Sequence, residues 1–214
     1  MGLDNSLKVK VIGGEFEDII LFITRIFQCY GLKTMIKDHT YDHRFYPVFP
    51  HTDDISPLNH TIDYRGIRYT FGESIEDKEI NDIDIYFLLY DLTDPVDDNK
   101  TIYVINESKR FLDYLEKIKA AGSSIIIVRN YTGVEDKNIS RISDLVNSED
   151  ILALPYNIKD HKYGILAGNN DNFRFTGISK EFQRVLLCIF RYIIRDTDTK
   201  HLHKAYHKAS KGGM

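Results

Sequence analysis

The hydrophobic pattern of the chain switches between the period of a strand and the period of a helix. Residues 8–12 alternate and stop at Gly13-Gly14, which predicts a strand that runs into a turn. Apolar residues then recur at helical spacing over residues 16–30, and residues 33–37 again suit a strand. A strand, a helix and a strand within about thirty residues form a βαβ unit, which requires a parallel sheet.

The rest of the chain continues this alternation. Residues 84–92 and 123–128 are nearly continuous apolar runs, which are typical of strands covered on both faces. Residues 40–59 and 164–177 lack a period, and we expect both to be loops. Further elements are expected at 61–71 (a hairpin), 101–105 and 151–154 (strands), and 108–121, 139–146 and 178–194 (helices, the last with Ser179 as N-cap).

This order of elements predicts one doubly wound α/β domain over residues 1–195, with a mostly parallel sheet and helices on both faces. Residues 196–214 follow as a short basic tail, which has four Lys and three His but no acid between positions 200 and 211. We expect this tail to be flexible. A chain of 214 residues is long enough to bury a core without disulfides or metals.

Composition and charge narrow the class of protein. No apolar run approaches the roughly 18 residues that a membrane span needs, and the first ten residues form no apolar signal segment, so we expect a cytoplasmic protein. The net charge is −4, and residues 52–98 are strongly acidic. Nucleic-acid binding by the whole domain is therefore not expected, because a negative field repels polyanions.

Candidate functional residues follow the predicted strands, since ligands of doubly wound sheets bind beyond the carboxyl ends of the strands. Each candidate also has a structural interpretation. An Asp at a strand end commonly makes local turn hydrogen bonds, and a Gly pair commonly serves a turn. The candidates are Gly13, Gly14, Asp38, Asp91, Asn130, Pro155 and Tyr156.

Several of these strand ends carry a resemblance to a known family. The segments are Val-Lys-Val-Ile-Gly-Gly at 9–14 with the helix after it, residues 32–38, Tyr-Phe-Leu-Leu-Tyr-Asp-Leu at 86–92, Ile-Ile-Ile-Val-Arg-Asn at 125–130, Leu-Ala-Leu-Pro-Tyr-Asn at 152–157 and Gly-Ile-Ser-Lys-Glu-Phe at 177–182. In their order and their strand-end residues, over about residues 8–195, they resemble the MinD/ParA group of P-loop ATPases, which carry a deviant Walker motif. Within that group the chain looks most like the branch of the Tad and Cpa pilus-assembly proteins.

The resemblance implies roles for the candidate residues. Asp38 would help to place the attacking water, and Asp91 would act through magnesium. Asn130 and Pro155, with Tyr156 beside them, would lie where the family holds its adenine base. ATP and Mg²⁺ are the implied cofactors, provided that the site still binds them.

The phosphate-binding loop departs from the family. A P-loop reads G-x-x-x-x-G-K-[ST], whereas residues 13–18 here are Gly-Gly-Glu-Phe-Glu-Asp, with no Lys, no Ser or Thr, and three acids. Like charges a few ångströms apart disfavour phosphate in this loop. We therefore expect a degenerate pseudo-ATPase, which acts as a binding or scaffold protein in the assembly or positioning of a surface apparatus such as a pilus or a secretion machine.

Other interpretations stay open. The chain is alternatively an NTPase with an atypical phosphate loop, or an adaptor that uses its basic tail on a membrane or nucleic acid. The expected partner is a protein, with a homodimer, or a heterodimer with an active relative, suggested by the resemblance. A histidine-rich stretch with scattered Asp offers metal ligands without any metal-binding spacing, so we expect it to be a solvated loop; its histidines are His39, His43, His51 and His60.

Overall fold

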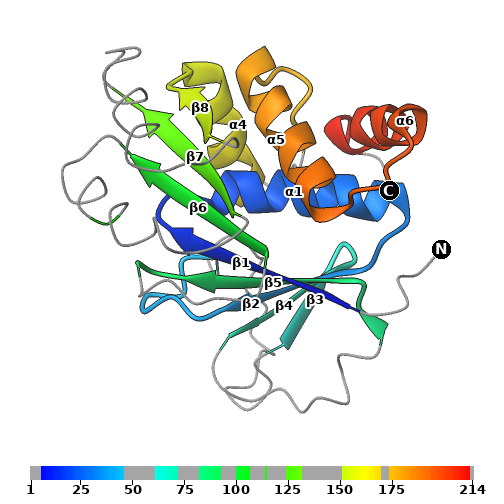
Figure 1. Cartoon of the computed structure of the whole chain (residues 1–214), viewed down its shortest axis with the longest axis horizontal. Helices are drawn as coiled ribbons and strands as arrows, with labels where there is room; N and C mark the ends of the chain where they lie inside the picture. Colours follow the sequence, from blue (N-terminus) through cyan, green and yellow to red (C-terminus); the bar gives the residue numbers. More distant parts are fainter. Residues whose placement is uncertain are drawn as a thin grey trace.

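Eight strands form one sheet in the computed structural model (Figure 1), in the order β3-β4-β2-β5-β1-β6-β7-β8. The structure describes residues 6–45, 61–71, 82–92, 100–106, 114, 124–131, 151–169 and 174–212. The strands are β1 (Leu7–Gly13), β2 (Thr34–Asp38), β3 (Thr61–Tyr64), β4 (Ile67–Phe71), β5 (Ile85–Tyr90), β6 (Lys100–Asn106), β7 (Ser124–Asn130) and β8 (Ile151–Pro155).

The sheet is parallel except at one edge. β1 lies in its middle, with Val11 opposite Leu89 of β5 and Ile102 of β6. β3 and β4 form the predicted antiparallel hairpin, which turns at Arg65 and Gly66 with φ angles of 49° and 75°. The predicted α/β fold with a mostly parallel sheet is confirmed.

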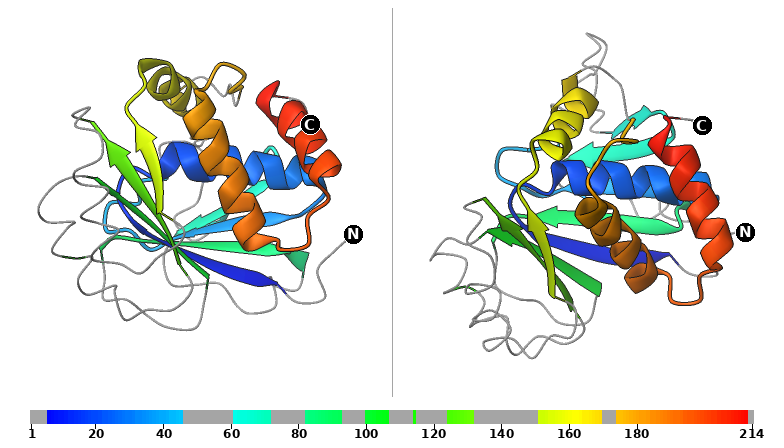
Figure 2. Two further views of the ribbon diagram at one scale, coloured as in Figure 1. Left: turned by 45° about the horizontal axis from the view of Figure 1, so that its top comes forward. Right: turned by 90° about the horizontal axis from the view of Figure 1, so that it is seen from above.

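The described helices gather on one face of the sheet, as Figure 2 shows. They are α1 (Glu17–Tyr30), α4 (Ile158–Asn169), α5 (Lys180–Ile193) and α6 (Thr199–Ser210). α1 buries Phe22 and Phe27, which stack on Phe175 and on Phe190 of α5 with ring centroids 4.6 and 4.4 Å apart. This core also contains Val9 and Val11 of β1, and it fixes where α1 begins beside the end of that strand.

The opposite face of the sheet is also buried. Alternate residues of β1, β6 and β7 point away from α1 and form a second cluster, which includes Ile12, Tyr103 and Ile126. Tyr114, which is helical and lies within the predicted 108–121 helix, packs edge-on against Tyr103. Burial on both faces explains why β7 is a nearly continuous apolar run in the sequence.

Two predictions were wrong. Part of the loop expected over 164–177 is the end of α4. The first turn of α4 is capped by Asn157, because the Asn157 side chain accepts the Lys159 N–H at 2.9 Å. The tail expected to be flexible contains α6, which packs along α1. Its apolar face, which includes Leu202 and Tyr206, is buried against α1. This burial offsets the conformational entropy that is lost when an otherwise strongly polar helix forms.

Other predictions fall outside the described residues. They are the helix over 139–146, the 108–121 helix apart from Tyr114, and residues 46–59 of the long loop. The predicted N-cap of α5 is confirmed, because the Ser179 hydroxyl accepts the Phe182 N–H at 3.1 Å. Among the described residues, no helix is long and apolar enough to cross a membrane.

Candidate functional site

The carboxyl ends of the parallel strands bring the candidate residues to one edge of the sheet. β2 and β5 lie on one side of β1, and β6, β7 and β8 lie on the other. In doubly wound sheets a crevice opens where the strand connections diverge in this way. The loop after β1 is therefore the place to look for a ligand site.

Gly13 is needed for packing. Its φ is 136°, and a Cβ at this position would lie 1.9 Å from the Val104 carbonyl oxygen of β6. Gly14 donates its N–H to the same oxygen at 3.1 Å. The first Gly thus serves the close approach of two backbones.

The loop between β1 and α1 is short. Only Gly14, Glu15 and Phe16 separate the two elements, and the Phe16 side chain is completely buried. A P-loop needs several successive residues whose amides curl around a phosphate. With Phe16 anchored in the core, this loop has no length left for such a cradle.

The first turn of α1 carries two carboxylates where a phosphate-binding helix presents free amides. Asp18 Oδ1 accepts the Ile19 N–H at 2.7 Å and also forms an ion pair with Arg129 of β7. Burial raises the pKa of Glu17, and the neighbouring charge of Asp18 raises it further, against the opposing effects of its own backbone hydrogen bond, Arg44 and Arg129. The positive end of the helix is therefore neutralised by the chain itself.

Asp38, at the end of β2, is fully buried and saturated with hydrogen bonds. Its Oδ1 accepts from the N–H and the hydroxyl of Thr40, at 2.9 and 2.5 Å. Its Oδ2 accepts from the Phe45 N–H at 3.0 Å and the Tyr69 hydroxyl at 3.1 Å. These four donors make Asp38 the anchor of the 38–45 turn, as the structural interpretation predicts.

Asp91, after β5, lies closer to the surface and pairs with an arginine. Its Oδ1 is 2.7 Å from Nη2 of Arg44, and its Oδ2 accepts the Tyr41 N–H at 2.8 Å. Arg44 also contacts Asp42 at 3.1 Å and donates to the Gly13 carbonyl at 3.4 Å. A cation therefore stands beside the loop after β1, but two carboxylates already hold it.

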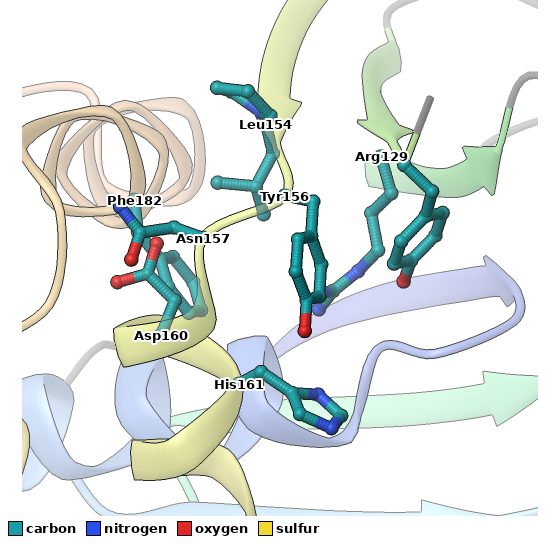
Figure 3. Close-up of a pocket in the computed structure, with 9 residues that line it drawn as sticks. Arg129, Leu154, Tyr156, Asn157, Asp160, His161 and Phe182 are labelled. Atoms are coloured by element: carbon teal, nitrogen blue, oxygen red, sulfur yellow. The ribbon is translucent and has the colours of Figure 1, made fainter. Parts of the chain in front are cut away.

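The residues expected near a base line a pocket at the ends of β7 and β8 (Figure 3). Asn130 is 7% exposed, and its carbonyl accepts the Tyr156 N–H at 2.7 Å. In Figure 3, Tyr156 lies beside Arg129, and both point toward His161 in the first turns of α4. This pocket, which Pro155 also lines, has a volume of about 30 Å³, which is room for a water molecule or two and too small for a purine.

A larger cleft of about 440 Å³ opens next to this pocket. Glu15, Glu17 and Asp18 contribute three carboxylates, and Arg129 contributes the guanidinium that is paired with Asp18. Glu15 has a φ of 55°, and its carboxylate accepts a hydrogen bond from the hydroxyl of Tyr131. The cleft is negatively charged on balance, so it suits a cationic group better than a phosphate. We call it the acidic cleft.

The sequence did not single out the two arginines of this site. Arg129 directly precedes the candidate Asn130, and its place at the end of a buried strand was the available signal. Arg44 lies in a stretch without a period, and nothing in the sequence connects it to Asp91. The structure brings the candidates together in two groups, with Gly13, Gly14, Asp38 and Asp91 around the ends of β1, β2 and β5, and with Asn130, Pro155 and Tyr156 at the ends of β7 and β8.

The described histidines form no metal site. His39 stacks on Tyr90 with ring centroids 4.9 Å apart, and burial lowers the pKa of this imidazole. Among the described residues, no three His, Cys, Asp or Glu side chains gather as ligands. His51 and His60 lie outside the described residues.

Comparisons with known proteins support the fold. No family model matches the chain, and a search of curated proteins finds no match. A protein described as a plasmid partition protein of Borrelia burgdorferi B31, solved with bound AMPPNP, is 9% identical, has a TM-score of 0.51, and is matched over 90% of this chain and 100% of its own. The MinD cell division protein of Aquifex aeolicus is 13% identical, with a TM-score of 0.47 and coverage of 94% and 96%. At this identity, the likeness to the plasmid partition protein shows a common α/β fold.

Proposed function

We propose that this chain is a MinD/ParA-like protein that has lost phosphate binding and acts as a binding or scaffold protein. The observation that supports the proposal is the first turn of α1. There Glu17 and Asp18 occupy the place from which a P-loop presents its amides, lysine and hydroxyl to phosphate. Asp18 already accepts the Ile19 N–H and pairs with Arg129.

The electrostatic cost of nucleotide binding at this place is large. Two like unit charges 4 Å apart repel by about 4 kcal/mol at an effective dielectric constant near 20. A triphosphate beside the first turn of α1 would meet at least two carboxylates, Glu17 and Asp18. Replacing the Asp18–Arg129 contact with a phosphate–Arg129 contact would also leave Asp18 without its counter-charge.

The acidic cleft is the proposed contact with a protein partner. Tyr131, Tyr156 and Ile165 lie at or beside it and are 41%, 51% and 48% exposed, which suits an interface rich in aromatic and apolar side chains. Glu15 and Glu17 favour a Lys or Arg side chain of the partner between them. A homodimer, or a heterodimer with an active relative, is the form of partnership that the sequence resemblance suggests.

The sequence resemblance to the Tad and Cpa branch extends the proposal to a role. In it, the chain helps to assemble or position a surface apparatus such as a pilus or a secretion machine. This step rests on the sequence segments at the strand ends, and the fold is compatible with it. Light scattering tests the homodimer, and a monodisperse monomer at high protein concentration contradicts that form of the proposal.

One observation favours the alternative of an NTPase with an atypical loop. Arg44 Nη1 lies 3.4 Å from the Gly13 carbonyl, so a cation does stand beside the loop. Asp91 would then act through magnesium, and Arg44 would leave Asp91 to contact phosphate.

Phosphate release from MgATP separates the two functions. The scaffold proposal predicts that the wild type, Asp91→Asn and Arg44→Gln all release phosphate at the rate of the buffer. Hydrolysis by the wild type that Asp91→Asn abolishes would establish the alternative. Lys204→Gln, on the exposed side of α6, is a matched control for the loss of one charge far from Arg44.

A further inference from the structure

A second cleft lies at the opposite end of the sheet, where α1 ends and β2 and β4 begin. It has a volume of about 340 Å³, and its lining comes from α1, from the segment between α1 and β2, from the turn between β3 and β4, and from α6. Its described lining contains no Asp or Glu, whereas it contains four cations: Arg25, Lys33, Arg65 and Lys208. We call it the basic groove.

The buried cation of the basic groove is held in a fixed position. Arg25 is 2% exposed, and its Nη1 donates to Gln28 Oε1 at 2.6 Å and to the Arg65 carbonyl at 3.2 Å. Gln28 Nε2 donates to the same carbonyl at 3.3 Å. Burial lowers the pKa of Arg25; the neighbouring Cys29 opposes this shift and Arg65 adds to it. A bound anion would offset the cost of keeping these charges together.

Helix α6, near the C-terminal end of the sequence, supplies Lys208 to the basic groove. The His201 ring contacts Tyr30 with centroids 4.3 Å apart and lies 3.2 Å from the Tyr30 carbonyl, while Leu202 and Tyr206 are buried against α1. This packing holds Lys208 over the last turns of α1. The groove is thus formed before any ligand arrives, which reduces the entropy that binding must overcome.

The end of α1 does not oppose an anion as strongly as a bare helix C-terminus would. The Gln28 carbonyl accepts the Gly31 N–H at 3.0 Å, and the Phe27 carbonyl accepts the Leu32 N–H at 2.9 Å. Gly31 has a φ of 102°, and no atom lies within 4 Å of the position that its Cβ would take, so the floor of the groove is open there. Lys33 forms an exposed ion pair with Asp82. Arg65 and Lys208 are exposed residues of the lining, whereas Arg25 is buried and adds its positive charge from inside the protein.

We propose that the basic groove binds a phosphate monoester. Two guanidinium groups and an ammonium group suit a phosphate dianion, because planar N–H donors match its oxygens and the positive charge balances it. The volume falls within the range of small-ligand sites, which leaves room for a small organic body on the phosphate. This site is separate from the acidic cleft, and the proposal for it does not depend on the proposed function.

Cys29 provides a readout within the groove itself. It lines the groove and is a free thiol, and Cys188 on α5 is a second free thiol outside the groove. Mass spectrometry monitors the rate at which a maleimide alkylates each thiol. The rate is measured at increasing concentrations of inorganic phosphate and, separately, of glycerol 3-phosphate. Glycerol and acetate are the neutral and carboxylate controls. Both phosphates are expected to slow the alkylation of Cys29 and to leave Cys188 unchanged.

Variants then assign the protection to the groove. Arg65→Gln and Lys208→Gln are each expected to weaken the protection of Cys29 roughly tenfold, since each removes one charge-assisted contact. Lys204→Gln, an exposed lysine on α6 outside the groove, is expected to leave it unchanged. Tighter protection by glycerol 3-phosphate than by phosphate identifies an esterified ligand, and equal protection identifies free phosphate; both support the site.

Two results would overturn the proposal. One is the absence of protection by both phosphates, and the other is protection that persists undiminished in Arg65→Gln and Lys208→Gln. If both phosphates fail, duplex DNA is tested in the same assay, and protection by DNA would identify the groove as part of a nucleic-acid surface.

Discussion

Arg129 at the end of β7 and Asp18 in the first turn of α1 form an ion pair, and each side chain is only 14% exposed. The pair joins two elements that are 111 residues apart in the sequence. In the proposed function, this carboxylate and its counter-charge lie where the family resemblance would place phosphate and a cation.

Breaking the ion pair between Arg129 and Asp18 is expected to destabilise the fold. Asp18→Asn or Arg129→Gln should each lower the free energy of unfolding by about 3 kcal/mol, because the remaining charge stays largely buried without its partner. Urea unfolding measures the effect. The double variant should lose less than the sum of the two single variants.

The exposed pair between Lys33 and Asp82 is the control for this experiment. Its side chains are 60% and 71% exposed, so Asp82→Asn should leave the unfolding curve unchanged within error. Additive losses in the Asp18 and Arg129 variants would contradict the contact itself.

Asp38 is expected to be a structural residue. Asp38→Asn presents an amide nitrogen to two of the four donors that surround the carboxylate, so unfolding should become easier by about 3 kcal/mol. Tyr69→Phe removes one of these donors and should cost about 1 kcal/mol. Urea unfolding of both variants tests the assignment, and an Asn variant as stable as the wild type would return Asp38 to the list of functional candidates.

The packing of α6 predicts that the C-terminal region contributes to stability. Leu202 is completely buried, and Leu202→Ala should lower the melting temperature through a loss of about 3 kcal/mol. Lys204→Ala, on the exposed side of the same helix, should have little effect. A flexible tail would instead make both substitutions neutral.

Glu17 should make stability depend on pH. Burial raises its folded-state pKa above the ordinary value of 4.5, so the folded state holds the proton more tightly than the unfolded state. The stability that this proton confers is fully present below the unfolded pKa and is lost as pH rises through the folded pKa. Glu17→Gln should therefore be more stable than the wild type at neutral pH.

Urea unfolding of the wild type and Glu17→Gln at two pH values tests the sign of this pH dependence. The advantage of Glu17→Gln should shrink as pH falls toward about 3, where the wild-type carboxyl is protonated in both states. An advantage that stays constant with pH would show that the ionisation of Glu17 does not cause it.

The sequence predicted β5 and β7 well because most of their residues on both faces are buried, so each strand is a nearly continuous apolar run. It missed α6 because Lys and His dominate its composition, although Leu202, Ala205, Tyr206 and Ala209 follow helical spacing. It missed α4 because the exposed Ile158 and Ile165 give this helix no clear apolar face, and Gly164 lowers its helix propensity.

The candidate site was predicted in part. The strand ends were found, because parallel strands place their carboxyl ends at one edge of the sheet. The pairing of Arg44 with Asp91 and of Arg129 with Asp18 was not found, because each depends on tertiary contacts between segments at least 47 residues apart. The helical or strand period of hydrophobic residues does not predict contacts between segments that are distant in the sequence.

Calorimetric titration of the wild-type protein with ATP and ADP, with and without Mg²⁺, tests the central claim most directly. The account predicts no heat of binding up to millimolar nucleotide, because Glu17 and Asp18 in the first turn of α1 would repel a phosphate there. Binding at micromolar nucleotide would contradict it.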